Sequence, residues 1–459
     1  MSKLDRRSFL FTAGRASAGA LAFSGLVNRT ALVSANSSAR SLSTAGYGPL
    51  FPTESTNTGQ TLLALPKGFK YTVIGKTGAI MSDGLRTPGA HDGMAAFHVG
   101  NELRLIRNHE VASLVGRPGG AIGPHAYDAL AGGGTTTLVI NPETREVIRD
   151  FVSLSGTLVN CAGGPTPWQS WISCEETLLG KERYKNASGQ DQGGFDQNHG
   201  YCFEVSARAD KPVNPVPLKG MGRFKHEAIA VDAKSGIVYL TEDQAACGFY
   251  RFLPHKRGKL ADGGRLQMLS VKGRPNFNTT KEQRAGVALP VIWVDINDPD
   301  PAAAQRDEMA VYNQGIAAGA ATFCRLEGCL YGNGRIYFTS TSGGDKHLGQ
   351  VWEYAPSGKD HGFLKLLVEP TDPSILNMPD NLCLTPRGNL VICEDNGVAN
   401  YLKVLNRRGE LFDFAKNIFD GFETREFAGV TFSPDFKTLF VNIQVPGLTL
   451  AIWGPWQSL

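Results

Sequence analysis

Residues 160–176 read Asn-Cys-Ala-Gly-Gly-Pro-Thr-Pro-Trp-Gln-Ser-Trp-Ile-Ser-Cys-Glu-Glu. A cysteine in a Gly/Pro-rich turn is followed, about fifteen residues later, by two adjacent carboxylates. If the segment between them is a β-hairpin, its two ends return to one place, and the thiol of Cys161 meets Glu175 and Glu176. A soft sulfur ligand beside hard oxygen ligands suits a mixed site for a transition metal and a hard cation.

The same layout recurs along the chain: a polar or small residue, an apolar strand, a Gly/Asn/Asp turn, a second apolar strand and a polar end. The six segments are 91–110, 161–176, 226–243, 325–340, 380–395 and 427–442. Their turn residues tolerate the positive φ that hairpins require, and their strands are rich in Val, Ile, Leu, Tyr and Phe. Six such hairpins predict an all-β fold, a six-bladed β-propeller, with a β-sandwich as the alternative.

A propeller would gather the ends of its innermost hairpins around one mouth of a central channel. So many carboxylates around one axis repel each other, and multivalent cations relieve that repulsion. The pattern therefore predicts a metal cluster at the central channel, although any single acid can also simply end a strand in solvent. The residues at this mouth would be Asp92, Asn108, Glu110, Cys161, Glu175, Glu176, Glu227, Glu242, Asp243, Glu327, Asp380, Glu394 and Asp395.

The N-terminal residues predict export. Asp5-Arg6-Arg7-Ser8-Phe9-Leu10 is a twin-arginine pattern, and it leads into an apolar stretch that Arg15 interrupts and that is too short to span a membrane. We interpret residues 1–35 as a twin-arginine signal peptide, which makes the twin-arginine translocase a partner and the periplasm or the exterior the destination. The alternative is a disordered N-terminus with a chance Arg pair. Residues 36–60, rich in Ser, Thr, Gly and Asn, predict a flexible arm, and residues 61–459 the propeller catalytic domain.

The composition argues against two classes of binding partner, nucleic acids and membranes. The chain has 54 Gly and 25 Pro, which favours an all-β fold, and a net charge of only +3 without a basic stripe. Nucleic acid and membrane surfaces are therefore not indicated. A closed propeller needs no second subunit, so we expect a monomer. Of the eight cysteines, Cys383 and Cys393 or Cys324 and Cys329 could pair across hairpins, or they are buried free thiols.

Several motifs together resemble the PhoX alkaline phosphatase family along most of the chain after the signal. The block Cys161-Ala162-Gly163-Gly164, Thr166-Pro167-Trp168 and Cys174-Glu175-Glu176 is the most specific. The other matching motifs are Ser82-Asp83-Gly84, His91-Asp92-Gly93-Met94, Arg107-Asn108-His109-Glu110, Gly132-Gly133-Gly134-Thr135, Gly222-Arg223-Phe224-Lys225-His226-Glu227, Glu242-Asp243, Arg325-Leu326-Glu327-Gly328 and Pro379-Asp380-Asn381.

The resemblance implies a six-bladed propeller that is exported by the twin-arginine route and hydrolyses small-molecule phosphomonoesters with ferric iron, Fe(III), and calcium, Ca²⁺. It implies that Cys161 is a thiolate ligand of iron, that Glu227 and Glu327 bridge metals, and that Glu175 and Glu176 bind calcium or iron. Arg325 would bind phosphate. Asp92, Glu110 and Asp395 would be further metal ligands, and Asn108 would contact the substrate. Cys161, Arg325 and Glu327 form the expected catalytic group.

Other functions remain open at this point. One is a different hydrolase on the same fold, either a phosphodiesterase or a calcium-dependent lactonase or esterase; a lactonase needs neither a thiolate nor Arg325. Another is an exported propeller that binds metal without catalysis. We expect His91, His109 and His226 to be core or orienting residues rather than ligands.

Overall fold

The structure is a computed structural model that describes residues 46–112 and 120–458. All described residues belong to one unit, Leu42–Leu459. The predicted signal peptide, residues 1–35, lies outside the described residues and stays a prediction, as does the first part of the expected arm.

Six antiparallel hairpins form at the six segments that the sequence predicts, and the all-β propeller fold is confirmed. Most of their apolar side chains are buried, as β-branched and aromatic residues in strands usually are. The hairpins are β4 (His91–Val99) with β5 (Glu102–His109), β8 (Asn160–Pro165) with β9 (Ser170–Glu175), β13 (His226–Val231) with β14 (Val238–Glu242), β18 (Leu326–Gly332) with β19 (Arg335–Ser340), β22 (Pro379–Leu384) with β23 (Leu390–Glu394), and β26 (Phe427–Phe432) with β27 (Thr438–Ile443).

Further strands extend each hairpin outward into a sheet. They are β6 (Gly133–Ile140) and β7 (Val147–Thr157) beside β5; β12 (Cys202–Ser206) beside β9; β15 (Tyr250–Pro254), β16 (Gly264–Val271) and β17 (Ala288–Asp295) beyond β14; β20 (Gln350–Pro356) and β21 (His361–Val368) beyond β19; β24 (Tyr401–Leu405) and β25 (Leu411–Asn417) beyond β23; and β28 (Leu448–Trp453) beside β27.

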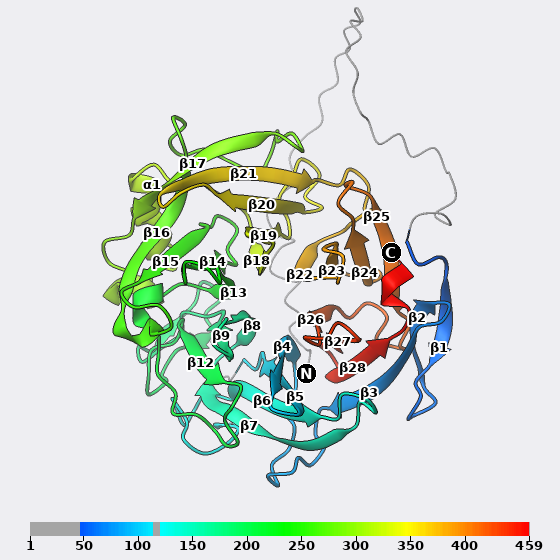
Figure 1. Ribbon diagram of the computed structural model, residues 1–459. Helices are drawn as coiled ribbons and strands as arrows, with labels where there is room; N and C mark the ends of the chain where they lie inside the picture. Colours follow the sequence, from blue (N-terminus) through cyan, green and yellow to red (C-terminus); the bar gives the residue numbers. More distant parts are fainter. Residues whose placement is uncertain (1–45, 113–119, 459) are drawn as a thin grey trace, which may run out of the picture. The chain divides into compact units, whose positions relative to one another are not determined.

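The first strands of the hairpins form a closed ring. Each contacts the first strand of two neighbouring hairpins, in the order β4, β8, β13, β18, β22, β26 and back to β4. Figure 1 shows these six strands around the centre, with the later strands of each sheet outside them. Because β17 pairs with β21 and joins two groups into one nine-stranded sheet, six separate blades remain a prediction that this ring supports.

The apolar core lies between neighbouring sheets rather than at the centre. In the described residues, a separate cluster of buried apolar side chains fills each of the six interfaces around the ring. Between the β13 and β18 groups, for example, Phe249 stacks on Phe338 with 4.2 Å between ring centroids. This arrangement leaves the centre of the ring to polar side chains.

The start of the described chain completes sheets from its end. Strand β3 (Lys70–Lys76) pairs with β28, and β2 (Thr61–Pro66) pairs with β25. Part of the expected flexible arm, residues 36–60, forms a strand instead, because β1 (Leu50–Glu54) pairs with β2. The outer edge of β2 offers unpaired backbone groups that β1 satisfies, so ordered pairing begins before residue 61.

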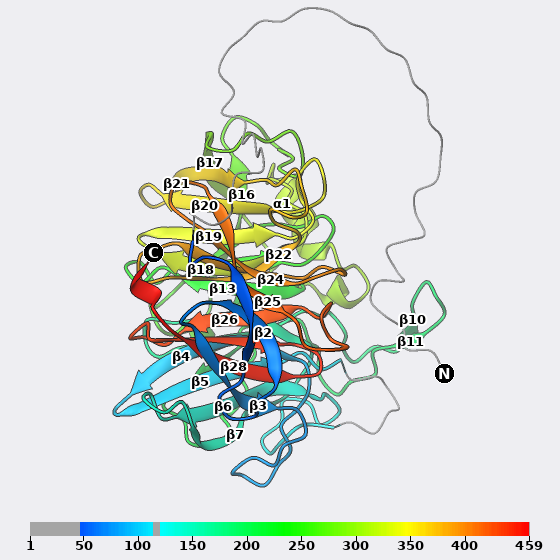
Figure 2. The same cartoon turned by 90° about the vertical axis from the view of Figure 1, so that its right-hand side faces the viewer.

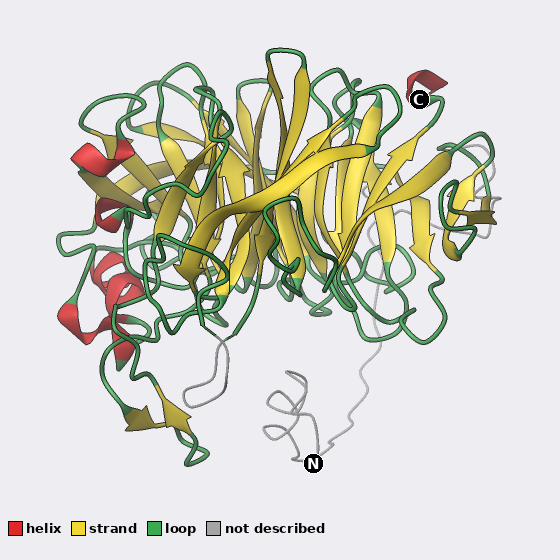
Figure 3. Cartoon of the chain, turned by 90° about the horizontal axis from the view of Figure 1, so that it is seen from below, coloured by secondary structure: helices red, strands yellow, loops and turns green. Residues whose placement is uncertain are grey.

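In the part of the chain that the structure describes, helices are few and short. They are α1 (Ala310–Ala317) and 3₁₀ turns at Lys219–Met221, Leu260–Asp262, Ala302–Gln305 and Trp456–Ser458; Figure 3 shows how strongly strands predominate. A small hairpin of β10 (Tyr184–Lys185) and β11 (Asp191–Gln192) stands away from the ring in Figure 2. No helix in the described residues has the length and apolar character needed to cross a membrane.

Candidate metal centre

Each of the six hairpins contributes two residues from the same end, and we call these twelve the channel residues. The leading residue is the second residue of the hairpin's first strand, and the trailing residue directly follows its second strand. The leading residues are Asp92, Cys161, Glu227, Glu327, Asp380 and Ala428. The trailing residues are Glu110, Glu176, Asp243, Thr341, Asp395 and Gln444.

One backbone hydrogen bond repeats in all six hairpins and fixes the trailing residue. Its N–H donates to the carbonyl of the residue two positions before the leading residue, over 2.8–3.3 Å. These acceptors, which we call the rim residues, are Ala90, Val159, Lys225, Arg325, Met378 and Glu426. A shift of strand register follows in every hairpin, and such bulges redirect side chains.

The repeated geometry brings seven ligand-type side chains together. Their ligand atoms form three groups, each within 4.8 Å: Asp92, Glu110 and Cys161; Cys161, Glu176 and Glu227; and Glu227, Glu327 and Asp380. Cys161 and Glu227 each belong to two groups, so the three groups adjoin. Six of the residues that the sequence predicts as ligands thus meet, and Asp380 joins them.

Burial and mutual repulsion act on these acids. Burial, reinforced by the carboxylate of Glu327, raises the pKa of Glu227 well above the ordinary value. The pKa values of Asp92, Glu327 and Asp380 are likewise raised well above theirs, first by burial and then by neighbouring carboxylates. One oxygen of Glu227, Oε2, is buried without a hydrogen-bond partner among the described residues. A cation would supply the missing partner and relieve the repulsion, so the donor set fits metal ions.

Cys161 provides the one sulfur among these donors. Its Sγ lies 3.3 Å from Oε1 of Glu227, and burial together with the carboxylate of Asp92 raises the pKa of the thiol well above its usual value. Without a cation the group therefore stays protonated. A bound metal reverses this preference, because a coordinating thiol is deprotonated.

Arg325 brings a cation to the edge of the same cluster. Its Nε and Nη2 donate to Asp243 over 3.0 and 3.2 Å, and Nη2 also donates to Glu327 over 2.7 Å. Burial opposes its charge, but attraction to both carboxylates raises the pKa of Arg325 above its ordinary value. Its side chain is 27% exposed, so a bound anion can reach it.

The β26 hairpin differs from the other five because it supplies no acid among the channel residues. Its trailing residue, Gln444, donates from Nε2 to Asp92 over 2.9 Å and to Glu110 over 2.6 Å. An amide that bridges two carboxylates keeps them together without a further charge. Gln444 was not among the residues predicted from the sequence, although its position directly after a repeated strand could have indicated it.

Asn108 does not support the expected substrate contact. Its Nδ2 donates to the carbonyls of Cys161 and Ala162, and its Oδ1 accepts from Trp171 and Ser173. The side chain is fully buried. Asn108 therefore holds the strand that carries Cys161.

Glu175 lies outside the three donor groups. Its carboxylate accepts hydrogen bonds from the backbone N–H of Leu158, Gly200 and Tyr201 and lies 2.6 Å from Nδ1 of His199. Successive residues on a strand point to opposite sides. In the pair Glu175-Glu176, the first acid therefore points away from the donor groups and the second points toward them. Glu242 follows the same rule and accepts from Gly248 and Tyr250.

Asp395 lies next to the donor groups rather than within them. Its charge raises the pKa of Asp380 and of Glu426, after the larger effect of burial. Glu426, a rim residue, was absent from the sequence prediction, because it precedes its strand and belongs to no acidic pair.

The three histidines are core residues, as expected. His91, His109 and His226 are buried, and each hydrogen-bonds a backbone carbonyl. The eight cysteines are free thiols. Of the two alternatives, free thiols rather than disulfides are found, because Cys383 pairs in register with Val391, Cys393 with Leu402 and Cys329 with Phe338.

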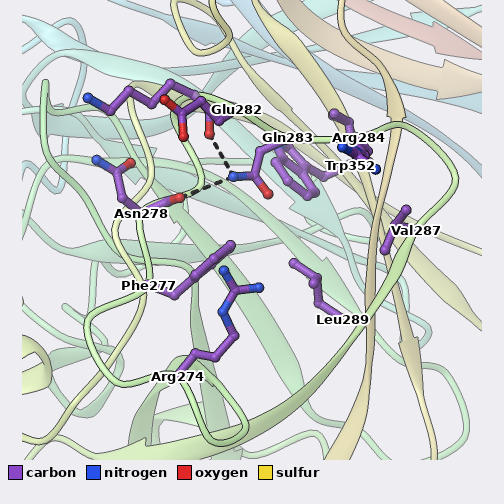
Figure 4. A pocket seen from close by; sticks show the side chains of 11 residues that line it. Arg274, Phe277, Asn278, Glu282, Gln283, Arg284, Val287, Leu289 and Trp352 are labelled. Atoms are coloured by element: carbon purple, nitrogen blue, oxygen red, sulfur yellow. Dashed lines mark hydrogen bonds between the residues drawn. The ribbon is translucent and has the colours of Figure 1, made fainter. Parts of the chain in front are cut away.

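A surface pocket of about 390 Å³ lies apart from the channel residues (Figure 4). In it, the amide of Gln283 donates to the carbonyls of Asn278 and Lys281. No channel residue lines this pocket, so it is not assigned to the candidate site. Its lining residues are Arg274, Phe277, Asn278, Lys281, Glu282, Gln283, Arg284, Val287, Leu289, Trp352 and Leu366.

Solved structures similar to this chain share little sequence with it. A gluconolactonase from Xanthomonas campestris is 14% identical, covering 89% of this chain and 98% of its own, with a TM-score of 0.40. A virginiamycin B lyase from Staphylococcus aureus is 10% identical over 84% and 99%, with a TM-score of 0.37. The PQQ domain of a pyranose dehydrogenase from Coprinopsis cinerea is 8% identical over 87% and 100%, with a TM-score of 0.33. At these scores the similarities carry no functional argument.

A comparison with curated proteins finds no match. A comparison with models of protein families, in contrast, identifies the family of this chain. The family model described as alkaline phosphatase PhoX matches residues 45–447, which include all twelve channel residues. This family consists of metal-dependent phosphatases that are typically exported and act on phosphate esters. The chain therefore belongs to the alkaline phosphatase PhoX family and is an enzyme of the phosphoric monoester hydrolase class.

Proposed function

We propose that this protein is an exported phosphomonoesterase whose three adjoining donor groups hold ferric iron and calcium ions. The observation that carries the proposal is the sharing of Cys161 and Glu227 between donor groups. Shared ligands place cations side by side, which suits a substrate with several negatively charged oxygens. A thiolate suits a transition metal such as iron, and the surrounding carboxylates suit calcium.

The ligand assignment follows the three groups. Asp92, Glu110, Cys161, Glu176, Glu227, Glu327 and Asp380 would hold the ions. Such ions supply charge neutralisation at the phosphoryl oxygens and a bound water of lowered pKa. The chain's own contribution is to hold seven donors in place before the substrate arrives.

Arg325 is the proposed phosphate-binding residue. Asp243 and Glu327 hold its Nε and Nη2, while Nη1 makes no hydrogen bond within the described residues. A guanidinium fixed in this way presents planar donors that match phosphate oxygens. We accordingly assign Arg325, Glu327 and Cys161 to catalysis.

Two measurements on the purified mature protein test the proposal: elemental analysis of bound metals, and hydrolysis of a chromogenic phosphomonoester with and without added calcium. We expect iron and calcium in the protein and hydrolysis that falls when calcium is chelated. Calcium alone without phosphatase activity would overturn the metal assignment and reduce Cys161 to a buried thiol. A lactone and a phosphodiester serve as control substrates, and we expect slower turnover of both.

We further propose export through the twin-arginine translocase, followed by action as a monomer in the periplasm or outside the cell. Arg6 and Arg7 carry this proposal, and both precede the described residues. Replacement of both by lysine should leave the protein in the cytoplasm. Undiminished export of that variant would contradict the proposed route.

A further inference from the structure

Two of the six rim residues are cationic, and they lie on neighbouring hairpins. Lys225 precedes β13 and Arg325 precedes β18, and these strands contact each other in the ring. Lys225 stands two positions before Glu227, which belongs to two donor groups. Arg325 stands two positions before Glu327, which belongs to one. The repeated backbone bond places both at equivalent positions in their hairpins.

The two side chains also have similar surroundings. The side chain of Lys225 is 26% exposed and that of Arg325 is 27% exposed. Asp243 contacts both residues, since its N–H donates to the carbonyl of Lys225 and its carboxylate accepts from Arg325. Both residues therefore adjoin Asp243, one of the channel residues.

Glu308 holds Lys225 at this position. Its Oε2 lies 2.7 Å from Nζ of Lys225 and accepts from Nε2 of Gln244 over 3.1 Å. The backbone carbonyl of Gln244 in turn accepts from the N–H of Arg325. Because Glu308 is 45% exposed, its ion pair contributes little stability, and an incoming anion can replace it.

We propose that Lys225 is a second phosphate-binding residue, which contacts the substrate phosphoryl group together with Arg325. This inference rests on the proposed function. A phosphate monoester presents several charged oxygens, and Arg325 has only Nη1 left for them, because its Nε and Nη2 donate to Asp243 and Glu327. Ala90, Val159 and Met378 at the other rim positions offer no side-chain donor, and Glu426 repels anions. The phosphoryl group is accordingly held on the side of β13 and β18.

Substitution of Lys225 tests the inference in the metal-loaded enzyme. Lys225→Met keeps the apolar stem and removes the charge, and we expect KM for a chromogenic phosphomonoester and the inhibition constant of inorganic phosphate both to rise roughly tenfold. Lys225→Arg should restore most of the affinity, because it keeps a cationic donor. Iron and calcium content should match the wild type.

Glu308→Gln separates substrate binding from a structural role. If Lys225 binds phosphate, this variant should bind inorganic phosphate more tightly, because a competing carboxylate is gone. If Lys225 only anchors Glu308, both variants should be equally impaired, which would overturn the inference. Lys234→Met, at the turn of the same hairpin, is the matched control and should behave as the wild type.

An unchanged KM and an unchanged inhibition constant in Lys225→Met would also overturn the inference while leaving the proposed function intact. A wild-type enzyme that hydrolyses no phosphomonoester would instead refute the proposed function itself. Loss of metal from Lys225→Met would assign the residue to the metal site rather than to the substrate.

Discussion

At the scale of single residues, the site depends on which of two adjacent side chains faces the centre. Glu175 and Glu176 have the same charge and adjoin in sequence, yet one is held by backbone donors and the other joins Cys161 and Glu227. Cys161 differs from every other thiol of the described chain because acids from three hairpins act on it. Function here follows orientation more than residue type.

Cys161→Ser tests the role of sulfur. The hydroxyl fits the space of the thiol, so the metal-free protein should keep its thermal stability. Metal affinity should fall by more than the 10- to 100-fold typical of substitutions behind the ligands, because a direct donor changes. Elemental analysis after dialysis measures this. Cys383→Ser alters a buried thiol outside the donor groups and is the control; equal metal loss in both variants would refute the ligand assignment.

Glu175→Gln and Glu176→Gln form a matched pair with opposite expected effects. In Glu175→Gln an amide N–H₂ would face backbone N–H donors, and the free energy of unfolding should fall by about 1–3 kcal/mol. Glu176→Gln removes a donor from the group of Cys161 and Glu227, so its metal content should fall. Denaturant unfolding and elemental analysis check the pair. Metal loss confined to Glu175→Gln would reverse the assignment.

At the scale of elements, the first strands of neighbouring hairpins meet backbone to backbone. A Cβ at Gly164 would lie 2.0 Å from the carbonyl oxygen of Ile229 on β13, and one at Gly93 would lie 2.6 Å from Cα of Ala162 on β8. Glycine is required there because an adjacent strand approaches. At both Gly163 and Gly164 the approaching groups belong to neighbouring strands, β9 and β13.

Gly164→Ala should therefore push β8 and β13 apart. We expect a loss of about 1–3 kcal/mol in the free energy of unfolding, as for other overpacked sites, together with weaker metal binding, because Cys161 and Glu227 lie on these two strands. The midpoint of denaturant unfolding measures the first effect. Gly89→Ala is the control, since its nearest neighbour would be Thr77 at 3.7 Å. Equal stability of the two variants would contradict the argument.

The hairpins could be predicted from sequence because each signal is local: alternating apolar residues and a turn rich in Gly, Asn or Asp. Five of the six leading residues could also be identified as chemically active. The direction of the Glu175 side chain could not be predicted without the strand register. The role of Asn108 could not be predicted without knowing that Trp171 and Ser173 lie beside it. Glu426 and Gln444 act across hairpins that are distant in sequence, and no local pattern reveals that.

At the scale of the whole molecule, apolar burial and charge are separated in space. Six apolar interfaces hold the ring, while carboxylates that repel each other occupy its centre. The stability that the apolar interfaces contribute offsets the repulsion between the carboxylates at the centre until cations bind. Metal binding should consequently stabilise the whole ring rather than one hairpin.

This balance predicts the pH dependence of the metal-free protein. Burial raises the pKa of Asp92, Glu227, Glu327 and Asp380 well above ordinary values, so the folded state binds more protons than the unfolded state. His199 acts in the same direction: burial opposes its protonation, but Glu175 and Asp128 outweigh burial and raise its pKa to about 9. Stability falls with rising pH wherever the folded state holds the extra protons.

The metal-free protein should therefore lose stability steadily between pH about 7 and about 9, the range in which His199 gives up its proton. Above pH about 7.5 the buried His91, His109 and His226, whose pKa values are lowered, are almost entirely neutral in both states and add little opposing slope. Thermal unfolding of chelator-treated protein across this range measures the effect. Saturating calcium and iron should abolish most of the slope, because bound cations replace the protons of the channel carboxylates. A stability that rises with pH in the metal-free protein would show that these acids are already ionised in the folded state, and that cations are not needed to balance them.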